Sequence, residues 1–239
     1  MTISTVTILL LGFVLGLKHA TEADHLAAVS TIVTERKSLL SSAIVGGIWG
    51  LGHTISLLTV GVFVLLLDFR ISERSESILE ACVGIMLFFL GLNVMQKIIR
   101  GATLHFHSHA HGGRLHAHPH LHTDEREHEE THTHHGFSLS PRPLMIGMMH
   151  GLAGSAALML LVIPTIDSRI IGLLYIIIFG AGSIVGMMLM SLVVSLPLHL
   201  TAMRFNRANV LLRCLAGLLS MGLGLWIVYE KCFADKLVG

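Results

Sequence analysis

Five ionisable residues fall within eight positions of the stretch 16–33, GLKHATEADHLAAVSTIV: Lys18, His19, Glu22, Asp24 and His25. The sequence around them is apolar, and a charged side chain at the centre of a bilayer costs roughly 2.5–3.5 kcal/mol on insertion scales. Such groups must therefore be paired or bind an ion. Imidazole nitrogens and carboxylate oxygens suit Ni, Co, Zn or Cu better than Mg or Ca. The stretch predicts an intramembrane site for a transition-metal ion or for protons.

A regular helix would place some of these groups on one face. At about 100° per residue, His19, Glu22 and His25 lie within an arc of about 120° and can converge on one ion. Asp24 lies about 140° from His19 on such a helix. It can join them only if the helix is broken or bulged there, and otherwise supports the site indirectly or faces another helix.

Two further histidines lie in apolar sequence, His53 within GLGHT and His150 within GMMHG. We expect His53 to be a further metal ligand and His150 to be a secondary one. A hydrogen bond to a neighbouring helix explains either histidine alone equally well. In the same way, Glu22 could form an ion pair with Lys18 one helical turn away. The cluster as a whole favours a functional site, because packing gives no reason to bury so many charges.

The composition indicates an integral membrane protein. Of 239 residues, 53% are hydrophobic and 13% are charged, whereas a soluble domain is about 25% charged. Five apolar runs reach the ~20 residues that a spanning helix needs, namely 39–67, 78–99, 144–164, 170–200 and 208–229, and a sixth covers about 3–33. Continuous runs favour helices over barrel strands. We predict an all-α polytopic membrane protein with six transmembrane helices.

A histidine-rich tract divides the chain into residues 1–100, 101–141 and 142–239, with three predicted spans on each side of the tract. The tract contains 12 of the 17 histidines, and its polar composition predicts a solvated, disordered loop. We expect it to bind metal loosely as a reservoir or sensor; a linker without any metal function is the alternative. The expected ligands are His105, His107, His109, His111, His116, His118, His120, His122, His132, His134 and His135.

The two halves resemble each other. GLKHATEADHLA, from residue 16, aligns with GMMHGLAGSAAL, from residue 147, so that His19 matches His150; two further glycine-containing segments align at nearly the same offset. Because each half has an odd number of spans, the second half must be inverted in the membrane. Inverted three-helix repeats are typical of transporters, in which the substrate site lies near the midplane.

The pattern H-x-x-x-x-D-H formed by His19, Asp24 and His25 resembles the signature of the nickel/cobalt transporter superfamily, roughly RHAxDADHI. GLGHT, with His53, and the histidine-rich loop extend the resemblance over nearly the whole chain. The arrangement is similar to the short six-helix members of the urease-accessory type. The resemblance implies that these four residues recognise a transported divalent cation, Ni²⁺ or Co²⁺, with no tightly bound cofactor. Glu22 stands where the signature has aspartate.

Other function classes find less support. The tract contains a literal HExxH at 128–132, which would indicate a metallo-enzyme only in a buried, fixed frame with a third ligand. In a polar loop rich in histidine the match is expected by chance, so we predict no enzyme. The net charge of +1 offers no basic face for nucleic acid. The expected partners are the cation and membrane lipid, with a metallochaperone as a candidate and the oligomeric state left open.

Charge patterning predicts the topology. The loops after the first, third and fifth spans hold ten lysines and arginines, and the opposite side holds five. Positive residues accumulate in the cytoplasm, so both termini should lie outside the cell (inner) membrane and the histidine tract inside. A divalent cation gains about 4.6 kcal/mol per 100 mV on entering the cell. This favours uptake, and efflux with a metal-buffering loop is the alternative.

Overall fold

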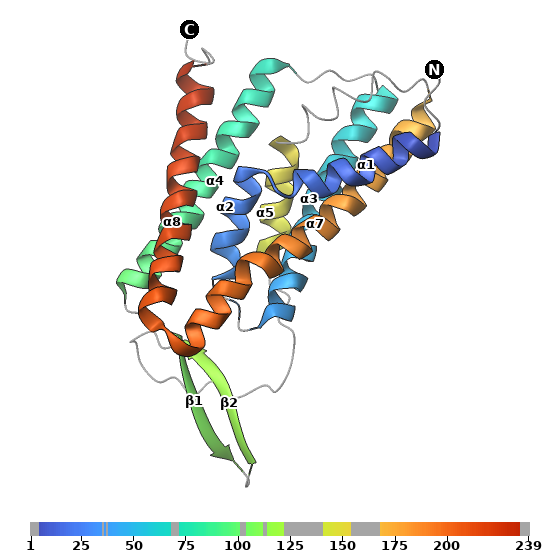
Figure 1. The fold of residues 1–239 in the computed structure, drawn as a ribbon. Coiled ribbons are helices and arrows are strands. Elements are labelled where there is room, and N and C mark those ends of the chain that lie inside the picture. Colours follow the sequence, from blue (N-terminus) through green and yellow to red (C-terminus); the bar gives the residue numbers. More distant parts are fainter. Residues whose placement is uncertain are drawn as a thin grey trace.

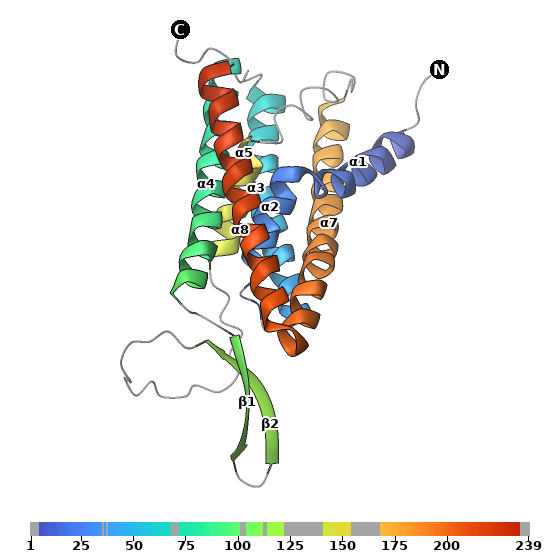
Figure 2. The same cartoon turned by 60° about the vertical axis from the view of Figure 1, so that its left-hand side comes forward.

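The computed structural model describes residues 5–34, 36, 38–67, 72–100, 104–111, 114–121, 141–153 and 168–234. Over these ranges the protein is a helical bundle from which a two-stranded ribbon projects at one end (Figures 1 and 2). The elements are α1 (Thr5–His19), α2 (Ala23–Val33), α3 (Leu39–Leu67), α4 (Glu73–Ile99), β1 (Leu104–His111), β2 (Arg114–Leu121), α5 (Arg142–Ala153), α7 (Arg169–Arg204), α8 (Asn206–Tyr229) and a final π-helical turn (Glu230–Ala234).

Four helices, α3, α4, α7 and α8, are long and apolar enough to cross a membrane, and α1 with α2 adds a fifth span if the pair crosses together. These helices are those expected of a helical membrane protein and, within the described ranges, account for four or five of the six expected spans. Helix α5 has 12 described residues, too few to span a bilayer on their own. The rest of the expected span 144–164 lies outside the described residues.

The first predicted span is not one continuous helix. Helix α1 ends at His19, and α2 begins at Ala23 after three intervening residues, at an angle of 57°. The hydroxyl of Thr21 donates a 2.6 Å hydrogen bond to the carbonyl of Lys18, and the backbone N–H of Glu22 bonds the carbonyl of His19 at 3.1 Å. Glu22 itself is extended, with ψ of 151°. One side-chain bond and one tight backbone turn thus replace the helical ladder here, and the common arc expected for His19, Glu22 and His25 on one regular helix is wrong.

Helices α3 and α7 form the centre of the bundle, with α1 packed on α7 and α5 packed on α3. Small residues allow the closest approaches. A Cβ added at Gly151 of α5 would collide with the carbonyl oxygen of His53, and one at Gly52 of α3 would collide with that of Leu144. The α3–α5 contact therefore depends on glycine on both helices, as is usual where membrane helices pack backbone to backbone.

Helices α4 and α8 form a second close pair. Gly84 faces Gly224 and Gly91 faces Gly217, and a Cβ at Gly84 would lie 2.8 Å from the carbonyl oxygen of Gly224. The hydroxyl of Ser220 also donates a 2.8 Å hydrogen bond to the carbonyl of Leu87. Helix α2 lies between this pair and the α3–α7 centre (Figure 2).

The predicted disorder of the histidine tract is wrong for the two segments that the structure describes. β1 and β2 form an antiparallel ribbon, so the described chain is not entirely α-helical. The register places His105 opposite His120, His107 opposite His118 and His109 opposite His116. Histidine at every second position has the period of a strand, a signal that composition alone conceals. The other tract positions, His122, His128, His132, His134 and His135 among them, lie outside the described residues.

Candidate metal centre

Four imidazoles from four different helices meet inside the bundle. His19 lies at the end of α1, His25 near the start of α2, His53 in α3 and His150 in α5, and each side chain is at most 1% exposed. His53 is the middle residue of the 29-residue helix α3. The cluster therefore lies halfway along a helix that is long enough to cross a bilayer.

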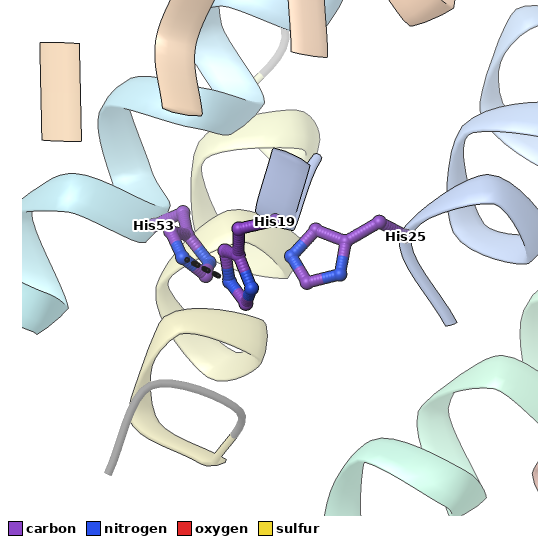
Figure 3. Close-up of side chains that lie close together, drawn as sticks. All are labelled: His19, His25 and His53. Atoms are coloured by element: carbon purple, nitrogen blue, oxygen red, sulfur yellow. Dashed lines mark hydrogen bonds between the residues drawn. The ribbon is translucent and has the colours of Figure 1, made fainter. Parts of the chain in front are cut away.

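His19, His25 and His53 form the first group of candidate ligands (Figure 3). The Nε2 atoms of His19 and His53 lie 3.2 Å apart, and the ring of His25 lies 4.4 Å from that of His19, centroid to centroid. Two bonds of about 2.1 Å to one ion separate cis or tetrahedral nitrogens by roughly 3.0–3.4 Å. The His19–His53 distance therefore fits two ligands of one metal ion, and it also fits one N–H···N hydrogen bond.

Asp24 joins His25 and His150 in a second group. Its Oδ1 lies 2.9 Å from Nδ1 of His25, and its Oδ2 lies 2.9 Å from Nε2 of His150. An ionised carboxylate only accepts hydrogen bonds, so each of these nitrogens carries the proton when Asp24 is charged. This arrangement leaves the other nitrogen of each ring as a free lone pair, which is how a carboxylate prepares histidine for a metal. With His25 and His150, Asp24 is also close enough to bind an ion directly.

The remaining ring nitrogens are short of partners. Nε2 of His25, Nδ1 of His53 and Nδ1 of His150 are buried and have no hydrogen-bond partner among the described residues. Buried polar atoms are normally satisfied, and an unsatisfied one costs free energy. The unpartnered nitrogens of His25 and His150 match lone pairs that bind an ion, whereas His53 faces His19 through its Nε2.

Glu22 lies at the edge of the cluster. Its Oε2 is 3.0 Å from Nδ1 of His19, and its side chain is 44% exposed. The contact lacks the alignment of a hydrogen bond, because Nδ1 of His19 has no hydrogen-bond partner of good geometry among the described residues. Glu22 can therefore attract a cation and orient His19 from a position still open to solvent or to an approaching ion.

Two aromatic rings enclose the cluster. Trp49, which is 1% exposed, lies 5.5 Å from His25 and 5.7 Å from His150, and Phe179 of α7 lies 5.5 Å from His19, all between ring centroids. Neither residue was predicted from the sequence. Trp49 stands one helical turn before His53, so the i, i+4 spacing could have placed it on the same face; Phe179 gave no comparable signal.

The structure therefore brings His19, Asp24, His25, His53 and His150 together, with Glu22 beside them. The break between α1 and α2 is what admits Asp24, as the sequence had left open. Lys18 is exposed. The candidate ligands of the tract lie on the ribbon, at the end of the molecule, or outside the described residues.

Comparison with known proteins reveals one close relative along the whole chain. The sequence is 39% identical over 240 residues to the urease accessory protein UreH of Bacillus sp. (strain TB-90), covering 98% of this chain and 96% of the relative. It is also 25% and 26% identical to the chloroplast proteins FOR GROWTH AND FERTILITY 1 and 2 of Arabidopsis thaliana, covering 95% of this chain but only 60% and 57% of theirs. No family model matches the chain. No solved structure matches it significantly.

Proposed function

The chain belongs to the family of the urease accessory protein UreH, and from this premise we propose that it is a membrane permease for Ni²⁺, with Co²⁺ as a second candidate. A urease accessory protein is a helper rather than a catalyst, so the protein is not an enzyme. A role beside urease is consistent with nickel handling, and the motif around Asp24 supports placement in the nickel/cobalt transporter superfamily.

The observation that carries the proposal is the convergence of four buried imidazoles and one carboxylate near the middle of the bundle. Imidazole is a preferred ligand of Ni, Cu and Zn, whereas isolated charged or polar groups are rarely kept at membrane depth without a function. A purely structural cluster would be expected to satisfy its own nitrogens, and each of these four imidazoles has a buried ring nitrogen without a hydrogen-bond partner among the described residues.

The two candidate ligand groups share His25. A cation held by His19, His25 and His53 can exchange one ligand at a time for Asp24 and His150, because His25 belongs to both groups. Stepwise exchange keeps the ion coordinated while it moves through an apolar environment. Mid-depth binding between two halves of a chain is also the arrangement found in secondary transporters.

Reciprocal packing supports the proposed inverted repeat. In α1, Gly16 lies against the backbone of Phe179 in α7; in α5, Gly147 lies against the backbone of Trp49 in α3. A second pair of equivalent contacts runs in the other direction: Gly182 of α7 lies against the backbone of Phe13 in α1, and Gly52 of α3 lies against that of Leu144 in α5. All four contacts follow the offset of 130 or 131 residues at which the two halves align. These pairs are what a pseudo-twofold axis in the membrane plane would produce.

We propose a multi-pass protein of the cell membrane with the histidine tract in the cytoplasm. The start of α1 and the end of α8 lie at the end of the bundle opposite the ribbon (Figure 1), which agrees with termini outside and the tract inside. Uptake follows the membrane potential and is favoured; efflux, with the tract collecting surplus metal, is the alternative. A metallochaperone that takes nickel from the tract is a candidate partner.

The test is the nickel content of cells that express the protein. We expect cells lacking their own nickel uptake to accumulate more ⁶³Ni²⁺ when the protein is made. In cells that express the His25→Ala variant, this additional uptake should be at least about tenfold slower. His199→Ala is the matched control, because His199 lies in α7 outside the cluster. A fall in cellular nickel would establish efflux instead. Unchanged nickel with correctly inserted protein would refute transport.

A further inference from the structure

A cavity of about 700 Å³ lies between α2, α4 and α5 and shares no residue with the histidine cluster. Its wall on α4 runs from Cys82 to Val94, a length of about 18 Å at 1.5 Å per residue. One leaflet of a bilayer has a hydrocarbon depth of about 15 Å, half of the full core. The cavity is therefore a groove about as long as one leaflet is deep.

The groove opens toward the outside of the bundle. Ile85 and Phe89 of α4 and Met145 of α5 line it, and they are 47%, 60% and 57% exposed. On helices that cross a membrane, exposed apolar side chains of this kind face lipid. An acyl chain can therefore enter the groove from the side without crossing a polar surface.

Two arginines line the same groove. Arg36 follows α2 and Arg142 begins α5, and both helix ends lie on the side of the bundle that carries the ribbon (Figure 1). The lining contains no acidic residue. The Nε of Arg36 is buried and has no hydrogen-bond partner among the described residues. A guanidinium group binds phosphate oxygens through two parallel hydrogen bonds, so this end of the groove has the chemistry of an anion site.

We propose that this groove binds one anionic diacyl phospholipid, with its phosphate at Arg36 and Arg142 and an acyl chain along α4 and α5. A net negative lipid is required because a zwitterionic headgroup would bring its own cation close to two arginines. Basic pockets between membrane helices on the cytoplasmic side bind anionic headgroups in this way, and the positive-inside pattern places both arginines on that side. The site is independent of the metal centre.

Cys82 provides the probe, because it is exposed and lines the groove. In a variant with Cys214→Ser and Cys232→Ser, a bimane label on Cys82 would report lipids with brominated acyl chains by quenching. We expect brominated phosphatidylglycerol to quench at a concentration at least tenfold lower than brominated phosphatidylcholine. The Arg36→Gln/Arg142→Gln double variant should abolish this difference.

The matched control is Arg74→Gln/Arg207→Gln, which removes two exposed arginines that do not line the groove. This variant should retain the preference for phosphatidylglycerol. Native mass spectrometry of the unlabelled wild-type protein should likewise retain one phosphatidylglycerol and no phosphatidylcholine, which tests the site even if the double variant does not fold.

Two results would overturn the proposal. The first is equal quenching and equal retention of the two lipids in the wild-type protein, which would indicate ordinary bilayer contact. The second is displacement of brominated phosphatidylglycerol by glycerol phosphate or inorganic phosphate at similar concentration, because the acyl groove would then contribute nothing to binding.

Discussion

Asp24 of α2 and His150 of α5 lie 2.9 Å apart, Oδ2 to Nε2, although 126 positions separate them in the chain. The other oxygen of the same carboxylate contacts His25. One acidic side chain therefore couples two imidazoles from opposite halves of the protein. It fixes which nitrogen of each ring is free, and removal of its charge should disturb both rings at once.

The first prediction concerns this carboxylate. Replacing Asp24 with Asn keeps the shape but removes the charge and one acceptor oxygen, so His25 and His150 can no longer both be held with a lone pair toward the ion. We expect the initial rate of ⁶³Ni²⁺ transport, normalised to the amount of protein in the membrane, to fall about 10–100-fold, as for other residues that orient metal-bound histidines. The control is Glu76→Gln, which alters a carboxylate of α4 outside both candidate ligand groups and should cost less than about threefold on the same scale. A wild-type rate for Asp24→Asn would contradict the role assigned to Asp24.

The second prediction concerns the contact between α3 and α5. Gly151→Ala places a methyl group against the backbone of His53, so α5 must shift and move His150 with it. Overpacking of this kind costs about 1–3 kcal/mol, and we expect a lower apparent Tm in detergent together with reduced nickel transport. Gly222→Ala is the control, because nothing lies within 4 Å of a Cβ there; it should be neutral or up to about 1 kcal/mol more stable. An equal apparent Tm and an equal transport rate for the two variants would show that neither stability nor transport depends on the α3–α5 spacing.

The third prediction separates the histidine tract from the metal path. Replacing residues 105–135 with a Gly/Ser linker of equal length should leave the transport rate within about threefold of the wild-type value, because both candidate ligand groups lie inside the bundle and contain none of the described tract positions. The amount of nickel bound by the purified protein should fall, as measured by equilibrium dialysis. Loss of transport as complete as that of His19→Ala, with the protein still inserted, would make the tract part of the permeation machinery. Loss of nickel transport on the His128→Ala substitution alone would instead favour a function of the HExxH motif at 128–132.

The fourth prediction concerns topology. Single cysteines at positions 2 and 120, in a background in which Cys82, Cys214 and Cys232 are replaced by Ser, should label differently in intact cells. A membrane-impermeant maleimide should reach position 2 directly and position 120 only after permeabilisation, since the larger number of positive residues lies on the tract side. Labelling of position 120 from outside would show that the topology is the reverse of the predicted one, and the tract could then not buffer metal in the cytoplasm.

Hydropathy predicts the long helices well and their interruptions poorly. The predicted span 39–67 coincides with α3, and the spans 170–200 and 208–229 fall within α7 and α8 extended by a few residues, because a continuous apolar run has only one favourable state in a bilayer. The break after His19 contains neither proline nor glycine. It arises from local hydrogen bonds, which hydropathy does not measure.

The candidate site was also predictable in part. Spacing grouped His19 with His25, and the resemblance to the nickel/cobalt transporter superfamily added Asp24. The structure places all three in one cluster. Spacing could not show whether His53 and His150 bond a neighbouring helix or belong to the metal site, because their positions depend on how α3 and α5 pack. Trp49 and Phe179 were missed because aromatic residues in apolar helices carry no chemical signature.

The burial of Trp49 against His25 and His150 has a spectroscopic consequence. The chain contains two tryptophans, of which Trp49 is 1% exposed and Trp226 is 61% exposed. Replacing Trp226 with Phe would leave a single indole whose ring lies within 6 Å of two candidate ligands. Its fluorescence is then an intrinsic reporter of the centre: an open-shell ion such as Ni²⁺ bound there would quench it, whereas Zn²⁺, which has a filled d shell, would not quench it by that route. The fluorescence of Trp49 can thus be used to compare the occupancy of the metal centre in detergent and in membranes without any added label.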